Sequence, residues 1–175
     1  MIILSAIGPD RPGMAHAVAQ ILADAGYNIE DTTMTRLAGE FAMILIVTPP
    51  ATLTLLDLQT RLAPLESSHG LFLSSREISA ETPVADHEAP RFIVSAYGAE
   101  HSGLLAKLTG VLAAQSVNIS DVQTRVASAG TVYVMIFEVQ LPPGLSQETL
   151  QTALEEAARE IGVTVSMHAI EEETL

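Results

Sequence analysis

The sequence predicts an α+β protein made of two ferredoxin-like βαββαβ domains, each an antiparallel sheet with helices on one face. Three observations predict this fold. A turn bounded by two glycines at residues 8–13 recurs at residues 98–103, and the segment Asn-Ile-x-Asp that begins at Asn28 recurs at Asn118 with the same spacing. Apolar, amphipathic and polar segments then follow in the same order in both halves. A polar stretch with two prolines separates the halves.

The first half opens with an apolar segment that stops at Gly8 and Pro9, which predicts a buried strand followed by a turn. Met14, Val18 and Leu22 then recur at helical spacing, and Pro12 suits the first position of this helix. The expected elements are a strand at 1–7, a helix from 12 to 26, an exposed or edge strand at 28–37, an apolar strand at 41–47, a helix that carries Leu53, Leu56, Leu62 and Leu65, and a strand at 71–78.

The second half repeats this order. Ser102 is expected to cap the first helix of this half, and Ser146 opens the second helix. Pro142 and Pro143 stop the apolar strand that precedes Ser146. The expected elements are a strand from 92, a helix that carries Leu104 or Leu105, Leu108, Val111 and Leu112, a polar strand at 118–126, a turn at 128–130, an apolar strand at 132–139, a helix at 146–161 and a strand at 163–170.

These segments divide the chain into a first domain at 1–78, a linker at 79–90 and a second domain at 91–175. The two central strands are apolar at both alternating positions, although a sheet with one solvated face alternates apolar and polar residues. We therefore expect the second face of each sheet, or an edge, to be covered by the sister domain or by another chain, and we expect a homo-oligomer.

Composition limits the classes of function. The chain has 175 residues, only eight Lys and Arg, and a formal net charge of −13. Binding to nucleic acid or to an anionic membrane needs cationic side chains, so neither is expected. No apolar run approaches the ~18 residues that span a bilayer. The first residues lack the features of a signal peptide, and a cytoplasmic location is expected.

No pattern of catalysis or metal binding stands out. Because the chain has no cysteine, thiolate sites are excluded. Its five histidines lack the spacing of metal ligands, and no dinucleotide-binding, phosphate-binding or serine-hydrolase motif is present. We therefore expect a protein without a cofactor, a metal ion or catalytic activity.

The glycine-bounded turn is the best candidate site. It presents backbone N–H groups at a helix start, where the macrodipole favours an anion such as a carboxylate. Asp10 offers an acceptor for an ammonium group, and Gly13 allows close approach of the backbone. Asn28 leads into the next strand and could direct a donor and an acceptor toward the same crevice. Together these groups match a free amino acid.

A purely structural interpretation of the same residues stays open. Gly, Pro and Asp are favourable turn residues, and Asn suits the entry to a strand. Duplication would preserve structural residues as well as functional ones.

The motif Asp10-Arg11-Pro12-Gly13, the following helix and the pair Asn28-Ile29 resemble the ACT domain, a regulatory module that senses amino acids. The resemblance covers both halves. Two such domains with this opening are similar to the glycine cleavage system transcriptional repressor family. The same opening heads formyltetrahydrofolate deformylases, whose catalytic domain has no counterpart here.

The resemblance implies an effector held between the first strand–helix loop and a neighbouring domain. In the second copy, Glu100-His101-Ser102 departs from Asp-Arg-Pro, which puts ligand binding there in doubt. The resemblance implies the ligand-binding residues Asp10, Arg11, Gly13, Asn28 and Ile29 in the first copy. In the second copy Gly103, Asn118 and Ile119 match, and Glu100 and His101 are candidates because they stand at the positions of Asp10 and Arg11.

The resulting hypothesis is a non-catalytic regulator that responds to an amino acid, with glycine as the first candidate. It would act as a transcriptional repressor of glycine cleavage through contact with a DNA-binding regulator. The alternatives are a regulatory subunit of a metabolic enzyme, or an interaction protein that ignores amino acids. An enzyme is the third and least favoured class.

Overall fold

The computed structural model describes residues 1–79, 89–127 and 132–170. It divides into two compact units, Met1–Val84 and Ala85–Leu175. Most of the expected linker and the whole expected turn at 128–130 lie outside the described residues. The domain boundaries at 78 and 91 therefore stay predictions.

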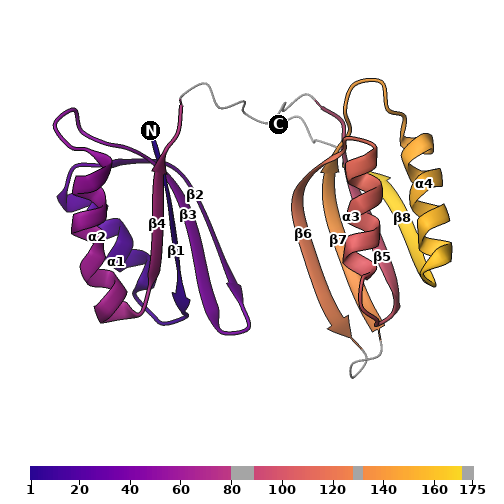
Figure 1. Cartoon of the computed structure of the whole chain (residues 1–175), viewed down its shortest axis with the longest axis horizontal. Coiled ribbons are helices and arrows are strands. Elements are labelled where there is room, and N and C mark those ends of the chain that lie inside the picture. The colour runs from indigo at the N-terminus through magenta and orange to yellow at the C-terminus, as the bar shows by residue number, and fades with distance from the viewer. Residues whose placement is uncertain (80–88, 128–131, 171–175) are drawn as a thin grey trace. The chain divides into compact units, whose positions relative to one another are not determined.

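Unit 1 contains the six expected elements in the expected order (Figure 1). They are β1 (Ile2–Pro9), α1 (Met14–Asp24), β2 (Asn28–Leu37), β3 (Glu40–Thr48), α2 (Leu55–His69) and β4 (Phe72–Glu77). All four strands pair antiparallel in the order β2-β3-β1-β4, so β2 and β4 are the edges. The prediction of an exposed edge strand at 28–37 is confirmed, because every residue of β2 is exposed.

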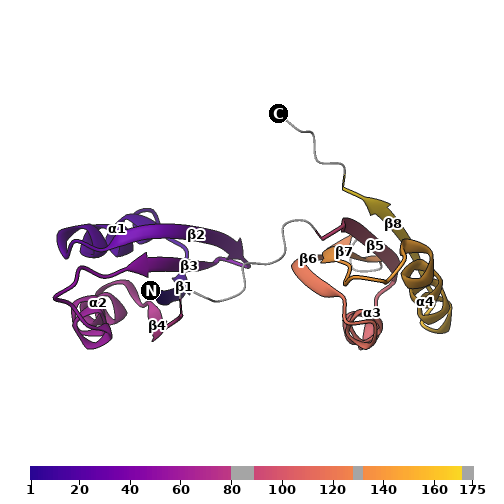
Figure 2. The same cartoon turned by 90° about the horizontal axis from the view of Figure 1, so that it is seen from above.

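Unit 2 repeats the same topology. Its elements are β5 (Arg91–Ala99), α3 (Leu104–Ala114), β6 (Asn118–Ala127), β7 (Val132–Gln140), α4 (Gln147–Glu160) and β8 (Val163–Ala169), with the strand order β6-β7-β5-β8. In each unit the two helices pack on one face of the sheet, as Figures 1 and 2 show. The predicted fold class, two βαββαβ units, is confirmed.

Each unit has its own core between its helices and its sheet. In unit 1, alternate residues of β1 and β3 meet the buried face of α1, where Met14, Val18 and Leu22 recur as expected. Phe41 and Phe137 are among the largest fully buried side chains of the two cores. The described residues bury no polar or charged side chain, so these cores are apolar throughout.

Three local expectations were wrong. Helix α1 begins at Met14 and not at Pro12, because Gly13 adopts φ 95° and ψ −7°, the third position of a type II turn, where proline commonly precedes glycine. Ser102 does not cap α3, since the left-handed Gly103 occupies that position. Leu56 is 69% exposed, and Leu58 is buried in its place because Leu58, Leu62 and Leu65 share one helical face at i, i+4 and i+7.

Candidate functional site

The first turn connects the end of β1 to the start of α1, and Asp10 anchors it to the neighbouring hairpin. The backbone N–H of Asp10 donates to the carbonyl oxygen of Gly39 at 2.9 Å. The Asp10 carboxylate accepts a hydrogen bond from Arg36 Nη1 of β2 at 3.0 Å. Asp10 was expected to offer an acceptor for an ammonium group, and one of its two carboxylate oxygens accepts from Arg36. Asp10 therefore also helps to position the turn.

Helix α1 starts without a side-chain cap. Gly13 is the N-cap residue, no side chain accepts from the first N–H groups, and the first turn holds no acidic residue. In α2, by contrast, Thr54 and Asp57 form a capping box. The positive end of the α1 macrodipole is thus uncompensated by side chains, which favours an anion there. A Cβ at Gly13 would meet no atom within 4 Å. Glycine is therefore favoured at this position by its positive φ and not by a lack of space.

The second turn has the same backbone but a different anchor. Gly103 has φ 92° and ψ −5°, and α3 also starts without a side-chain cap. Val126 stands in the copy of the Arg36 position, so the ion pair of the first turn has no counterpart. The hollow beside this turn has a volume of about 520 Å³ and is lined by Glu100, His101, Ser102, Gly103, Leu104, Leu105 and Tyr133.

His101 holds the second turn against the end of α4. Its Nε2 lies 3.0 Å from the carbonyl oxygen of Ile161, the C-cap residue of α4, and its Nδ1 lies 3.1 Å from the carbonyl oxygen of Ser102. A carbonyl oxygen only accepts, so both ring nitrogens must carry a proton, and the imidazolium is the form that satisfies both contacts. The hydrogen bond to Ile161, followed by the one to Ser102, raises the pKa of His101, while partial desolvation opposes this.

We predict that unit 2 loses stability as the pH rises. Because the pKa of His101 is raised on folding, its contribution is fully present below its unfolded pKa of about 6.5 and is lost as the pH rises through the folded value. The urea midpoint of unfolding should therefore be higher at about pH 5 than at about pH 8. His101→Gln should abolish the part of this difference that His101 contributes. The matched control is His16→Gln on α1, an exposed histidine of unit 1, which should keep the difference. An unchanged pH dependence in His101→Gln would contradict the assignment.

The structure separates the two halves of the predicted crevice within each unit. Asn28 pairs with Thr48 next to the start of β1, whereas the turn follows the end of β1, where Pro9 pairs with Glu40. The two places lie roughly 25 Å apart along the sheet, at ~3.3 Å per residue. The reason is that α1 returns the chain to the starting end of β1 before β2 begins. Asn118 and the second turn are separated in the same way.

The strand-start asparagines lie in different surroundings. Asn28 Nδ2 donates to Glu30 Oε1 at 2.9 Å, and this hydrogen bond is the main cause that lowers the pKa of Glu30. Asn118 Nδ2 donates to Gln140 Oε1 at 3.3 Å. Ile29 is 39% exposed, while Ile119 packs against the core of unit 2. The surroundings of Asn28 are therefore more exposed than those of Asn118.

The comparison with protein families decides the classification. The model of the ACT domain matches residues 1–75 and residues 90–168, which cover nearly all of both units. The chain belongs to the ACT domain family.

Individual relatives of this tandem ACT protein match it over shorter or more divergent stretches. A UPF0237 protein of Methanopyrus kandleri is 40% identical over 45 residues, which are 26% of this chain and 50% of that protein. The glycine cleavage system transcriptional repressor of Escherichia coli K12 is 33% identical over 46 residues, which are 26% of this chain and 24% of the repressor. The matches thus span between a quarter and a half of these curated relatives.

Two solved structures match the fold over both units. A crystal structure of an unknown protein from Galdieria sulphuraria has a TM-score of 0.80 at 28% identity, covering 97% of this chain and 98% of its own. A second crystal structure, provisionally described as a glycine cleavage system transcriptional repressor, has a TM-score of 0.73 at 19% identity. The match covers 98% of this chain and 97% of that chain. At that identity the second match shows the fold alone.

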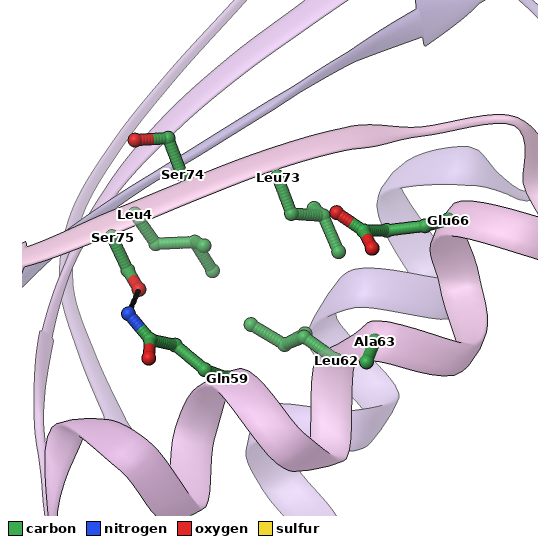
Figure 3. A pocket seen from close by; sticks show the side chains of 8 residues that line it. All are labelled: Leu4, Gln59, Leu62, Ala63, Glu66, Leu73, Ser74 and Ser75. Carbon is green, nitrogen blue, oxygen red and sulfur yellow. Dashed lines mark hydrogen bonds between the residues drawn. The ribbon is translucent and has the colours of Figure 1, made fainter.

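Another hollow, of about 390 Å³, lies between α2 and β4, away from the ACT turns (Figure 3). Figure 3 shows Gln59 and Ser75 joined across it by a hydrogen bond, from Gln59 Nε2 to Ser75 Oγ at 3.2 Å. Leu4 and Leu62, both almost fully buried, also line it. Within the described residues, no group of three His, Asp or Glu side chains could hold a metal ion. In the same residues no helix is long and apolar enough to cross a membrane.

Two residues beside the ACT turns are not among those predicted from the sequence. Arg36 anchors the first turn, and Tyr133 lines the hollow at the second. Aligning the two halves could have revealed Arg36, because Asp10 and Arg36 of the first half are replaced together by Glu100 and Val126 in the second. No signal in the sequence places Tyr133 beside the turn, because its position follows from pairing with Gly98 across the sheet.

Proposed function

We propose that this tandem ACT protein is a non-catalytic regulator that binds a free amino acid and transmits its occupancy to a protein partner. The observation that carries the proposal is the pair of left-handed glycine turns, each of which starts a helix without a side-chain cap. The second helix of each unit is capped by Thr54 or Ser146. Membership of the ACT family supports a regulatory, amino-acid-sensing role.

The ligand carboxylate would accept hydrogen bonds from the first N–H groups of α1, beside Arg11 and Gly13. The ammonium group would meet the free oxygen of Asp10 and an amide oxygen of an asparagine. Asn28 lies at the other end of its own sheet from the turn. The asparagine and isoleucine that complete a site would therefore come from another ACT domain. In the second turn, Glu100, His101 and Gly103 would take the places of Asp10, Arg11 and Gly13. Asn118 and Ile119 would be the corresponding pair at the start of a strand.

Glycine is the effector that we propose first, and the E. coli relative that is named for the glycine cleavage system supports it. The partner would be a DNA-binding regulator, and the chain would repress transcription through it in the cytoplasm. The net charge of −13 supports contact with a protein over contact with phosphates. Ligand can shift this contact only if it binds the two states of the protein with different affinities.

Affinity capture of partners by the full chain, with and without a mixture of free amino acids, tests the proposal. We expect one partner whose retention changes at least about tenfold when amino acids are added, which corresponds to ~1.4 kcal/mol of coupling. A captured partner that ignores every amino acid would overturn the sensor and favour a ligand-independent interaction protein or enzyme subunit. Asp10→Ala should weaken the response while leaving the partner-binding surface in place.

A further inference from the structure

The sheet face of unit 1 opposite the helices is exposed and apolar at its centre. Residues directly opposite each other on antiparallel strands share a face, which defines its rows. From β4 to β2, the rows are Arg76–Ile3–Ile46–Asp31, Ser74–Ser5–Ile44–Thr33 and Phe72–Ile7–Ala42–Thr35. We call these twelve residues the open face. Ile7, Ile44 and Phe72 are 45%, 44% and 67% exposed, which is typical of a surface that binds another protein.

Charge lies only at the edges of the open face, and both charges lie in one row. Arg76 ends this row on β4, and Asp31 ends it on β2, with Ile3 and Ile46 between them. A partner that covers the face must therefore bring an acidic group to one edge and a basic group to the other edge at the same height.

The open face also has a hollow and a projection side by side. A depression of about 240 Å³ lies over the two small side chains Ser5 and Ser74. Ile44, next to Ser5 in the same row, is half exposed and projects beside it. In the next row the large Ile7 lies beside the small Ala42.

We propose that two copies of the chain pack open face to open face about a two-fold axis parallel to the strands. This axis places β1 over the partner's β3 and β4 over the partner's β2, and it keeps every row at its own height. Arg76 then lies opposite the partner's Asp31, and Ile44 lies opposite the partner's Ser5, above the hollow. Ile7 lies opposite the partner's Ala42. Because the axis is two-fold, each of these contacts occurs twice.

A two-fold axis across the strands fits less well. It would place Arg76 over the partner's Phe72 and Asp31 over the partner's Thr35, leaving both charges without a partner. Ile44 would meet the partner's Ile44 while Ser5 met the partner's Ser5, so that the face would be overfilled at one point and empty at another. Size and charge both favour the axis parallel to the strands, which also matches the aligned packing of sheet on sheet.

The corresponding face of unit 2 suits this packing less. Glu138 stands where unit 1 has Ile46, and it is bound by Arg91 and hydrogen-bonded by Ser120 at 3.0 Å. Arg125 stands beside Val134 in a lower row of the same face. Covering this face with a second apolar sheet would remove these charged groups from water, which costs more than the ion pair returns. The second copy is therefore assigned to unit 1.

Sedimentation of the full chain across micromolar concentrations tests the interface. The proposed interface specifies the homo-oligomer expected from the sequence. It forms without an amino acid, so its failure would leave the proposed amino-acid sensor untouched. Ile44→Lys should weaken the dimer by at least about tenfold while circular dichroism stays native, because Ile44 is half exposed in the monomer. The matched control is Ile136→Lys, at the same place in unit 2, which should leave the dimer intact. A monomer at every concentration, or equal effects of the two variants, would overturn the proposal.

A charge exchange tests the direction of the axis. Asp31→Arg and Arg76→Asp each place two like-charge pairs in the dimer, and each should weaken it several-fold, more strongly at low salt. The double variant Asp31→Arg/Arg76→Asp restores opposite charges and should recover the affinity of the natural chain. A double variant whose loss of dimer affinity equals the summed losses of the two single variants would contradict the axis parallel to the strands.

Discussion

Asn28→Ala is expected to weaken binding of the amino acid roughly 10- to 100-fold, which corresponds to the loss of one hydrogen bond to a charged ligand. Asn28 begins β2, an exposed strand, and its amide donates to Glu30 at the surface. The amide is therefore accessible to a ligand that a neighbouring ACT turn presents. Calorimetric titration of the variant with the amino acid that binds the natural chain gives the affinity ratio.

Asn118→Ala is the matched variant and should change the affinity much less. Asn118 occupies the same position in unit 2 and donates to Gln140. The second half also lacks the Asp-Arg-Pro sequence and the pair formed by Asp10 and Arg36. Equal losses in the two variants would overturn the ranking of the two sites, even if both bind ligand.

Gly8→Ala is expected to destabilise unit 1 by about 1–3 kcal/mol, the usual cost of forcing a group into a packed site. A Cβ at Gly8 would lie 2.7 Å from the carbonyl oxygen of Gly70 and 3.2 Å from the side chain of Leu71. Both neighbours belong to the connection between α2 and β4, and the nearest atom is backbone. The strand end that leads into the first turn must therefore move, and urea unfolding should show a lower midpoint.

Gly110→Ala provides the control for Gly8→Ala. Gly110 lies inside α3, and a Cβ there would meet no atom within 4 Å. Alanine is the better helix former, so this variant should be more stable by about 0.5–1 kcal/mol. A neutral Gly8→Ala beside a stabilised Gly110→Ala would show that the approach of β1 to Gly70 is looser than the structure indicates.

Most of the fold was predictable because the sequence contains it twice. Each glycine-bounded turn, polar edge strand and apolar central strand supports the assignment of its copy, and the structure confirms all twelve elements. Some local details were predicted less well. Leu56 was placed on the buried face of α2, but Leu58 recurs with Leu62 and Leu65 at i, i+4 and i+7 and is the buried residue.

The candidate site was predictable only in part. The turn and its free helix start follow from Gly13 and Gly103, whose positive φ only glycine adopts readily. The sequence could not show that Asn28 lies at the opposite end of the sheet, because that depends on the direction in which α1 returns. It also could not show that His101 reaches Ile161, since this contact joins residues far apart in the chain.

The most direct test of the central claim is calorimetric titration of the full chain with glycine and then with each of the other common amino acids. We predict saturable binding of at least one of them, with glycine the first candidate, and a weaker affinity in Asp10→Ala. A folded chain that releases or absorbs no binding heat with any amino acid, and whose melting temperature none of them raises, would contradict the claim that this ACT protein senses an amino acid.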